Sequence, residues 1–361
     1  MNELSDAGRL SRIGLTPPIL AWLDQEPAAA DPTMRPMRVV EVQRDALTLH
    51  DGDVEWPGRP MPALVMALED RADALAVGDW VLAQRNVHGQ WWVHHRMPPQ
   101  TQIARRLHDG REKITRTVIV SNVDTALLVM GLDHDFNLRR LERFLALVRL
   151  AGVSAVVVLT KADLGDDVDQ RCRRVAALLP PDVAVVPLDS RDAGSCAALQ
   201  PWLQPGRTLV MLGSSGTGKS TLTNTLVGRP LQDIGGTRHG DGRGRHTTTS
   251  RSLHLLACGA CIIDTPGIRT LRLDSEAGDV QAVFDDIARL APTCRFRNCR
   301  HEHEPGCAVR EAVASERVDS FHKLLREAQR DSLSLRQRQE RLAEWKMRAR
   351  HARQVARAKG R

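Results

Sequence analysis

The chain has 361 residues, 42% of them hydrophobic and 26% charged, with a formal net charge of +7. These proportions are close to the averages of soluble globular proteins, so a wholly disordered or fibrous chain is excluded. The length exceeds what one hydrophobic core commonly supports, and we therefore expect two or three domains.

Residues 1–35 contain four prolines and an alanine run, and we expect a loosely ordered N-terminal extension with one short helix near residues 19–23. Residues 36–104 hold five short apolar stretches separated by Gly-containing turns, which indicate a small closed barrel. We predict an OB-type barrel, a frequent nucleic-acid binder; another small barrel that serves as a spacer is the alternative. The predicted strands are 37–42, 46–49, 61–68, 80–84 and 90–94.

Residues 105–275 change to an alternation of apolar strands and helical patterns. Apolar strands joined by helices predict a parallel sheet covered on both faces, so we assign this region to one α/β domain. The predicted strands are 117–132, 155–160, 183–188, 208–213 and 261–266, and the predicted helices are 138–150 and 167–179.

A phosphate-binding loop follows the fourth of these strands, where residues 213–221 read GSSGTGKST and match G-x-x-x-x-G-K-[ST]. Glycines let successive backbone N–H groups and the next helix N-terminus point at phosphate oxygens. Lys219 should contact the β and γ phosphates, and the Ser220 hydroxyl should hold Mg²⁺. A chance match is the alternative, but the flanking strand and the helix pattern over 222–227 supply the required context. The predicted nucleotide-binding residues are Gly213, Ser214, Ser215, Gly216, Thr217, Gly218, Lys219, Ser220 and Thr221.

Two further motifs are typical of a nucleotide switch. Asp264-Thr265-Pro266-Gly267 has the form D-x-x-G, in which Asp264 can hold Mg²⁺ through water and the Gly267 amide can contact the γ phosphate. Residues 240–249 form a polar stretch that ends in three threonines, one of which could reach Mg²⁺ in the triphosphate state. Spacing does not decide which threonine does so, and a plain surface loop is the alternative.

Base specificity requires a separate motif, because the phosphate loop does not distinguish ATP from GTP. A guanine-recognition box has the form N-K-x-D, and the chain carries Thr160-Lys161-Ala162-Asp163 at a strand end. Asp163 would accept both donors of the guanine N1 and N2 edge, while the Lys161 stem lies along the ring. The box precedes the phosphate loop, so the usual GTPase sheet must be circularly permuted. Thr160 stands where Asn is usual, residues 189–191 are a weaker candidate for a second guanine contact, and a fortuitous Lys and Asp at a strand end is the alternative.

A cysteine and histidine cluster follows the α/β domain, and Cys294, Cys299, His301 and Cys307 have the spacing C-x4-C-x-H-x5-C. Three thiolates and one imidazole suit a tetrahedral, structural zinc ion. Unrelated buried cysteines are one alternative, and His303 competes with His301 as the fourth ligand. The remaining cysteines, which are Cys172, Cys196, Cys258 and Cys261, we interpret as core residues.

The ordered set TKAD, GSSGTGKST, GRGRHTTT, DTPG and the Cys/His cluster resembles the small-subunit-dependent ribosomal GTPase family RsgA, also called YjeQ. The resemblance extends over about residues 37–313 and favours His301 over His303. It implies a multi-domain fold: an OB-type β-barrel, a circularly permuted α/β P-loop GTPase domain and a zinc-binding, mostly helical region over 276–335. It also implies GTP hydrolysis with Mg²⁺ and one structural Zn per chain. The implied partners are the 30S ribosomal subunit and its 16S rRNA, late in assembly, with hydrolysis triggering release.

The residue that orients the attacking water is not the usual one, because Ile268 stands where many GTPases carry glutamine after D-x-x-G. Intrinsic hydrolysis should therefore be slow, and the missing group must come from elsewhere. His246 beside the threonines is our catalytic candidate, and the resemblance supports it; a loop histidine without a catalytic part is the alternative.

The basic charge is concentrated at the end of a long polar helical pattern over 308–361. Residues 336–361 carry ten Arg or Lys and two acids, hence +8, while the preceding 335 residues carry 41 basic and 42 acidic groups, hence −1. Such a basic tail is typical of a solvated helix or of binding to a polyanion, and we favour RNA. The pair Trp91-Trp92 could stack on bases, although a Trp pair in a barrel is more often core.

No run of about 18 uncharged apolar residues appears, and residues 1–10 lack the order of a secretory signal. Seven unevenly spaced cysteines do not indicate a disulfide framework. We therefore expect a cytoplasmic monomer that binds GTP or GDP and no membrane. The alternatives are an ATPase, a permuted GTPase that acts on the large subunit or another RNA, and a GTP-gated RNA-binding adaptor that does not hydrolyse GTP.

Overall fold

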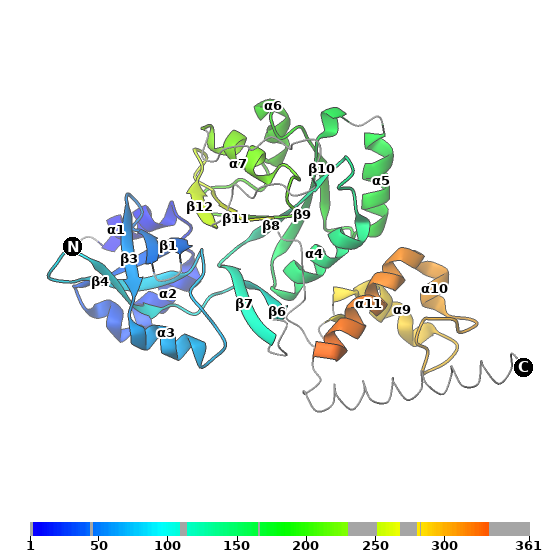
Figure 1. Cartoon of the computed structure of the whole chain (residues 1–361), viewed down its shortest axis with the longest axis horizontal. Coiled ribbons are helices and arrows are strands. Elements are labelled where there is room, and N and C mark those ends of the chain that lie inside the picture. The colour runs from blue at the N-terminus through cyan, green and yellow to red at the C-terminus, as the bar shows by residue number, and fades with distance from the viewer. Residues whose placement is uncertain are drawn as a thin grey trace, which may run out of the picture. The chain divides into compact units, whose positions relative to one another are not determined.

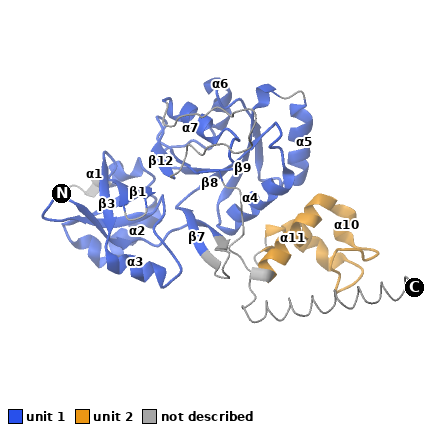
Figure 2. Ribbon diagram, viewed as in Figure 1, with its two compact units in different colours: residues 1–106, 116–271 blue, residues 107–115, 272–361 orange. Residues whose placement is uncertain are grey.

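The computed structural model describes residues 3–43, 46–108, 114–164, 167–229, 251–267, 280–281 and 283–331. The chain divides into two compact units, residues 1–106 with 116–271 and residues 107–115 with 272–361 (Figure 2). Among the described helices, none is both long and apolar enough to cross a bilayer.

Two helices and a 3₁₀ turn precede the barrel: α1 Glu3–Ser11, α2 Pro17–Gln25 and η1 Pro27–Ala30. Leu10, Ile13 and Ile19 from this segment are buried. The predicted short helix near residues 19–23 is confirmed as α2, but the expectation that the rest of this extension is loosely ordered was wrong. Proline at the first positions of α2 starts the helix rather than preventing it, because a helix leaves those N–H groups unpaired anyway.

Five strands close into the predicted barrel, in the order β1-β2-β3-β5-β4 with β4 pairing back to β1. Its interior is filled by apolar side chains from alternate strand positions, among them Met37, Leu49 and Trp91. Trp91 is thus a core residue and is not available for stacking on RNA. The strands are β1 Met34–Gln43, β2 Ala46–His50, β3 Glu55–Pro60, β4 Trp80–Arg85 and β5 Trp91–Arg96.

The predicted strand at 61–68 is wrong, because this stretch forms helix α3 Pro62–Glu69. Its Leu, Met, Ala and Glu residues favour a helix, and they do not alternate in polarity as a half-buried strand would. The third barrel strand is instead β3, which was not predicted because its two prolines and Gly58 are uncommon in strands. A side chain at Gly58 would meet Leu49 Cδ1 at 2.7 Å, so glycine lets β3 lie close to the barrel core.

The predicted strand at 117–132 divides at Asn122, whose φ of 53° is in the left-handed region that Asn tolerates better than most residues. Before the turn, β7 Ile114–Ser121 forms a two-stranded sheet with β6 Gln102–His108, and its Val120 also bridges to Val77; after the turn, β8 Thr125–Gly131 enters the central sheet.

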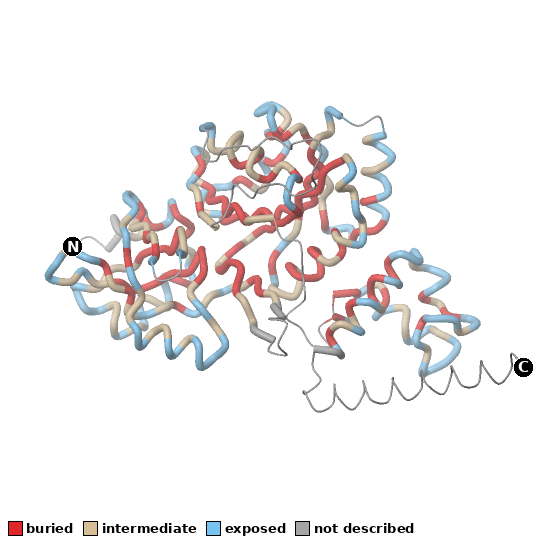
Figure 3. The backbone as a smooth tube through the Cα atoms, viewed as in Figure 1, coloured by how far each residue is buried: buried red, intermediate tan, exposed pale blue. Residues whose placement is uncertain are grey.

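The central sheet of the α/β region has the order β10-β9-β8-β11-β13-β12, and all neighbouring pairs are parallel except β12 with β13. Figure 1 shows helices on both faces, α7 on one and α4 on the other. Buried residues run along the middle strands, as Figure 3 shows. The strands are β9 Ser154–Thr160, β10 Ala184–Pro187, β11 Thr208–Leu212, β12 Ser252–Leu255 and β13 Cys261–Asp264, and the helices are α4 Leu138–Leu150, α5 Val168–Leu178, α6 Ala193–Cys196 and α7 Lys219–Val227, with the 3₁₀ turns η2 Ala162–Leu164 and η3 Ala197–Leu199.

The barrel and the central sheet share a strand pairing, because Glu41 of β1 pairs with Ser252 of β12. The junction also contains Arg38, a fully buried guanidinium whose Nη2 donates to the Asn122 carbonyl at 3.0 Å and whose Nε donates to the Gly78 carbonyl at 3.4 Å. Its Nη1 donates to the Ile13 carbonyl. One side chain thus joins the N-terminal segment, the barrel and the entry to β8.

The second unit contains α9 Asp285–Leu290, η4 Ala291–Thr293, α10 Ala308–Ala312 and α11 Ser315–Asp331. Its small core contains Phe284 and Phe321, with ring centroids 5.4 Å apart, and a paired Arg317 and Asp286. The helical pattern over 308–361 is interrupted between α10 and α11, and the basic tail at 336–361 lies outside the described residues. A barrel, a permuted α/β domain and a helical region with a Cys/His cluster confirm the predicted fold class; the predicted domain boundaries stay predictions.

Candidate functional site

The phosphate loop lies at the carboxyl end of β11, a strand whose five residues are all buried. Gly216 and Gly218 have φ of 83° and 90°, which side chains rarely adopt. A side chain at Gly213 would lie 2.3 Å from the Val129 carbonyl oxygen, so only glycine fits there. The nine residues of α7 then begin at Lys219, and the N–H groups of its first turn face the loop, as anion binding requires.

Lys219 is almost fully buried inside this loop. Its ammonium donates to the carbonyl oxygens of Gly213 at 3.1 Å and Ser214 at 2.6 Å. Burial lowers the pKa of Lys219 to about 8, although the Asp264 and Asp135 carboxylates oppose this shift. The loop therefore holds a poorly solvated cation, which an entering phosphate would compensate.

Two oxygen groups suited to Mg²⁺ lie next to each other beside the loop. Ser220 Oγ donates to Asp264 Oδ2 at 3.4 Å, and Asp264 is fully buried at the end of β13. Thr265 Oγ1 donates to the Met211 carbonyl at 2.6 Å, which ties the D-x-x-G segment to β11. A side chain at Gly267 would come within 2.4 Å of the Ser215 nitrogen, so this glycine lies against the phosphate loop.

The base box encoded upstream contacts the same loop. Buried Thr160 donates from Oγ1 to the Thr217 carbonyl at 2.6 Å, and Lys161 Nζ donates to the Gly216 carbonyl at 2.9 Å. The permuted strand order explains this contact, because β8 lies between β9 and β11 and the carboxyl ends of all three strands meet at one edge of the sheet. Ala162 follows on the same edge, where its N–H donates to the Leu188 carbonyl at 3.3 Å.

Asp163, the residue expected to read guanine, accepts from Arg191 Nη2 at 2.5 Å. Arg191 belongs to the 189–191 turn after β10, and its own N–H donates to Asp189 Oδ1 at 2.9 Å. The turn is held on α7, because Thr225 Oγ1 donates to the Ser190 carbonyl at 2.7 Å. A guanine base that uses Asp163 would have to exchange with this partly exposed ion pair, which is worth little because solvent screens it.

Several predicted functional residues lie outside the described residues: His246, the threonines at 247–249, the rest of the 240–249 stretch and Ile268. Their roles stay predictions. Sequence reasoning also missed two carboxylates near the loop, Asp133 and Asp135. Their position directly after β8, at the same edge of the sheet as the phosphate loop, is the signal that could have found them.

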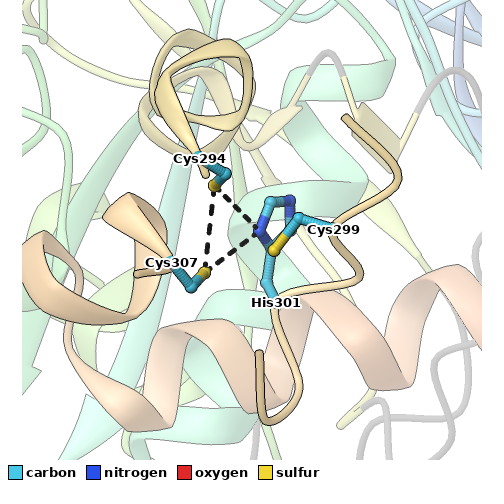
Figure 4. A group of neighbouring side chains, drawn as sticks. All are labelled: Cys294, Cys299, His301 and Cys307. Atoms are coloured by element: carbon cyan, nitrogen blue, oxygen red, sulfur yellow. Dashed lines mark hydrogen bonds between the residues drawn. The ribbon is translucent and has the colours of Figure 1, made fainter. Parts of the chain in front are cut away.

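The four predicted metal ligands come together in the second unit (Figure 4). Cys294 Sγ lies 3.6 Å from His301 Nδ1 and 3.9 Å from Cys307 Sγ, and the last two ligand atoms are 3.4 Å apart. With Zn–S of about 2.3 Å and Zn–N of about 2.0 Å, ligand atoms of a tetrahedral site lie roughly 3.5–3.8 Å apart. All four ligand atoms, including that of Cys299, lie within 4.8 Å of one another, so the cluster could hold a metal.

The loop that carries the ligands has its own supports. His301, with φ of 61°, supplies the imidazole of the cluster, and His303 is not part of it. The Glu304 carboxylate accepts from the backbone N–H groups of Arg300, Glu302 and His303, and these bonds lower its pKa to about 2. The loop is therefore shaped around the ligand positions by backbone hydrogen bonds.

The other cysteines that were interpreted as core residues have no such grouping among the described residues. Cys196 and Cys261 are buried, and burial raises the pKa of Cys196 to about 11. Cys258 lies in the tight turn before β13, closed by a hydrogen bond from the Gly259 N–H to the Leu256 carbonyl at 2.9 Å. None of these four cysteines belongs to a group of metal-ligating side chains in the described part of the chain.

Known proteins share both the sequence and the fold. A sequence model of the RsgA GTPase family matches residues 97–274. The "Small ribosomal subunit biogenesis GTPase RsgA" of Xylella fastidiosa (strain 9a5c) is 44% identical over 300 residues, which cover 83% of this chain and 85% of that protein. The protein of the same name from Mesorhizobium japonicum is 41% identical over 294 residues, 81% of each chain.

Two solved structures share the fold at 22% sequence identity. YjeQ from Thermotoga maritima superposes with a TM-score of 0.59 and covers 82% of this chain and 99% of its own. YloQ, described as a circularly permuted GTPase, gives a TM-score of 0.56 and covers 84% of this chain and 98% of its own.

Proposed function

This chain belongs to the RsgA GTPase family and is a ribosome-biogenesis GTPase, and from that premise we propose that it acts late in maturation of the 30S ribosomal subunit. The small subunit stimulates its GTP hydrolysis, and hydrolysis releases it from the particle. Membership confirms the family resemblance predicted from the sequence. The observation that carries the proposal is the identity of 44% to a protein named for small-subunit biogenesis, over most of both chains.

We assign guanine recognition to the box 160–163. The support is the pair of hydrogen bonds from Thr160 and Lys161 to the phosphate-loop carbonyls, which brings the box to the loop that would hold the phosphates. Asp163 accepts the guanine N1 and N2 donors once Arg191 has moved aside, and the Lys161 stem covers one face of the base.

Phosphate binding and hydrolysis then use the residues at the end of β11. The N–H groups of the loop and of α7 surround the phosphate oxygens, and the Lys219 ammonium exchanges its two carbonyl partners for the β and γ phosphates. Ser220 and Asp264 hold Mg²⁺, which when bound neutralises charge on the phosphates. The Gly267 amide contacts the γ phosphate. His246 orients the attacking water, and the ribosomal particle orders the loop that carries it.

We further propose that the Cys294, Cys299, His301 and Cys307 cluster binds one structural zinc ion. The support is the ligand chemistry and the separations of the ligand atoms, which suit a closed tetrahedral site. The basic tail at 336–361 contacts 16S rRNA, and the protein is a cytoplasmic monomer.

The decisive measurement is multiple-turnover phosphate release from GTP with isolated 30S, 50S and 70S particles. We expect 30S to raise the rate by about tenfold or more, because a partner must supply what the missing glutamine does not. His246→Ala should still bind 30S but lose the stimulation, while Arg12→Ala, which removes an exposed ion pair with Asp53, should keep it. Stimulation by 50S alone would refute the assignment, and GTP-dependent 30S binding without phosphate release would indicate an adaptor.

A further inference from the structure

Asp133, in the loop that follows β8, belongs to none of the motifs described above. Its Oδ2 accepts from Lys161 Nζ at 2.6 Å, and its Oδ1 accepts from the Asp135 N–H at 3.0 Å. Because each carboxylate oxygen has its own donor, the carboxylate plane is fixed relative to the loop. Lys161 therefore has a rigid acceptor outside the box to which it belongs.

The Lys161 side chain bridges two parts of the site. The same Nζ that contacts Asp133 also donates to the Gly216 carbonyl of the phosphate loop at 2.9 Å. One ammonium thus connects the end of β8 to the phosphate loop while its stem extends from the base box. In this family of sites that stem is the surface on which the purine would rest.

The surroundings are shaped for this contact. A side chain at Gly131 would lie 2.6 Å from Asp133 Oδ1 and 3.6 Å from Lys161 Cδ, so glycine leaves the space that both groups occupy. Lys161 itself has φ of 60°, a conformation that is strained for a residue with a side chain. Such strain persists only where neighbouring contacts fix the residue, and the two acceptors of Nζ do so.

The charges around Asp133 are consistent with a permanent ion pair. Burial alone would raise the pKa of Asp133, but the hydrogen bonds from Lys161 and from the Asp135 backbone hold the pKa below its usual value. His134 Nδ1 lies 3.4 Å from the same oxygen but is largely exposed. The Asp135 carboxylate pairs with Arg140 at 2.6 Å and does not compete for Lys161. The Asp133 and Lys161 side chains are each about three-quarters buried, so solvent and salt screen their attraction less than that of a surface pair.

We propose that Asp133 is a positioning residue for nucleotide binding, which fixes the Lys161 side chain across the rim of the phosphate loop before the base arrives. The inference rests on the proposed guanine nucleotide site and adds a residue to it. A preorganised lysine loses little further freedom when the nucleotide binds, so the contact should slow nucleotide release rather than speed entry.

The test compares full-length variants by their dissociation constants and release rates for a fluorescent GDP derivative. Asp133→Asn keeps the shape but removes the charge, and we expect about tenfold weaker binding through faster release, the usual scale for a charge-assisted hydrogen bond. Asp133→Glu should restore part of the affinity. Lys161→Met should weaken binding similarly, and adding Asp133→Asn to it should cause no further loss.

A matched control and a specificity readout separate positioning from general damage. Asp182→Asn is the matched control, because Asp182 forms an ion pair with Arg149 at 2.6 Å in the same domain. Asp182 lies just before β10, at the end of the sheet opposite the nucleotide site, so this change should leave GDP binding unchanged. Asp133→Asn should weaken GDP and IDP equally, since a stacked lysine stem does not read the N2 amino group. Asp163→Asn, in contrast, should reduce the preference for GDP over IDP.

The inference is overturned if Asp133→Asn binds GDP within twofold of the unaltered chain, or if its effect persists undiminished beside Lys161→Met. If Asp133→Asn lowers the unfolding temperature, its GDP affinity cannot be interpreted, and Lys161→Met becomes the deciding variant. The inference is then overturned if Lys161→Met binds GDP as tightly as the unaltered chain. The failure of the proposed guanine site looks different, because the unaltered chain would then bind ADP as tightly as GDP.

Discussion

The nucleotide site and the metal cluster obtain their geometry in opposite ways. Around the nucleotide site, β8, β11 and β13 are buried along their whole length, and the side chains of Thr217, Lys219 and Ser220 each contact a backbone carbonyl or a neighbouring carboxylate. The metal cluster instead lies on a loop between short helices, beside a small core of which Phe284 and Phe321 are the largest members. A wide apolar sheet can hold a polar site in place without a ligand, whereas a short loop needs the ligand as part of its structure.

This difference predicts that either unit can unfold without unfolding the other. The first should keep its fold and its nucleotide affinity when the cluster is disrupted, because none of the contacts described for the phosphate loop or the base box involves the second unit. The second should depend on the proposed metal, since coordination by four ligands from residues 294–307 would compensate for the small core of this unit.

The largest expected effect tests this dependence directly. Removal of metal by a strong chelator, or Cys294→Ser, should unfold residues 283–331, because structural zinc contributes on the order of 10 kcal/mol in small domains. Hydrogen exchange should show loss of protection confined to α9, α10 and α11, with GDP affinity retained. Cys258→Ser, a change of a half-buried cysteine outside the cluster, is the control. Continued protection of α11 after chelation would show that the helices alone hold the second unit together.

The next effect concerns a weak point within the first unit, the buried guanidinium of Arg38. Arg38→Met keeps an unbranched apolar stem but removes the guanidinium that lies over the Trp80 ring and leaves the carbonyls of Gly78, Asn122 and Ile13 without their donor. We expect a loss of about 2–4 kcal/mol in the free energy of unfolding, since buried acceptors lose their partner. Urea unfolding of the full chain measures it. Arg12→Met, at an exposed ion pair, should change stability by less than about 0.5 kcal/mol. Equal stability of the two variants would mean that apolar packing alone holds the barrel to the sheet.

The same contrast explains what the sequence could predict. The phosphate loop, the D-x-x-G segment and the four metal ligands are local patterns whose spacing carries their chemistry. The pairing of Asp133 with Lys161 joins residues 28 positions apart and depends on strand order, which spacing does not reveal. Helix α3 was mistaken for a strand because a run of apolar residues fits both structures, and the division at Asn122 was missed because a single left-handed residue leaves the apolar pattern intact.

The smallest effect follows from the buried ammonium of Lys219, which contacts carbonyl oxygens when no phosphate is bound. Lys219 has a pKa of about 8 when its partners are carbonyl oxygens, and bound phosphates raise that pKa because they favour the charged form. Binding therefore takes up a proton above pH 8, and GDP affinity should fall by up to about tenfold per pH unit there while staying level below about pH 7. Calorimetry in two buffers of different ionisation enthalpy at pH 8.5 counts the proton. Lys219→Arg, which stays charged, should bind GDP without that proton uptake. Any fall in the GDP affinity of this variant with rising pH then measures the separate effect of losing the guanine N1 proton. If the unaltered chain binds GDP with no proton uptake at pH 8.5, Lys219 is already fully charged in the empty loop. Its pKa would then lie well above 8, and the surrounding protein would stabilise the ammonium more than burial destabilises it.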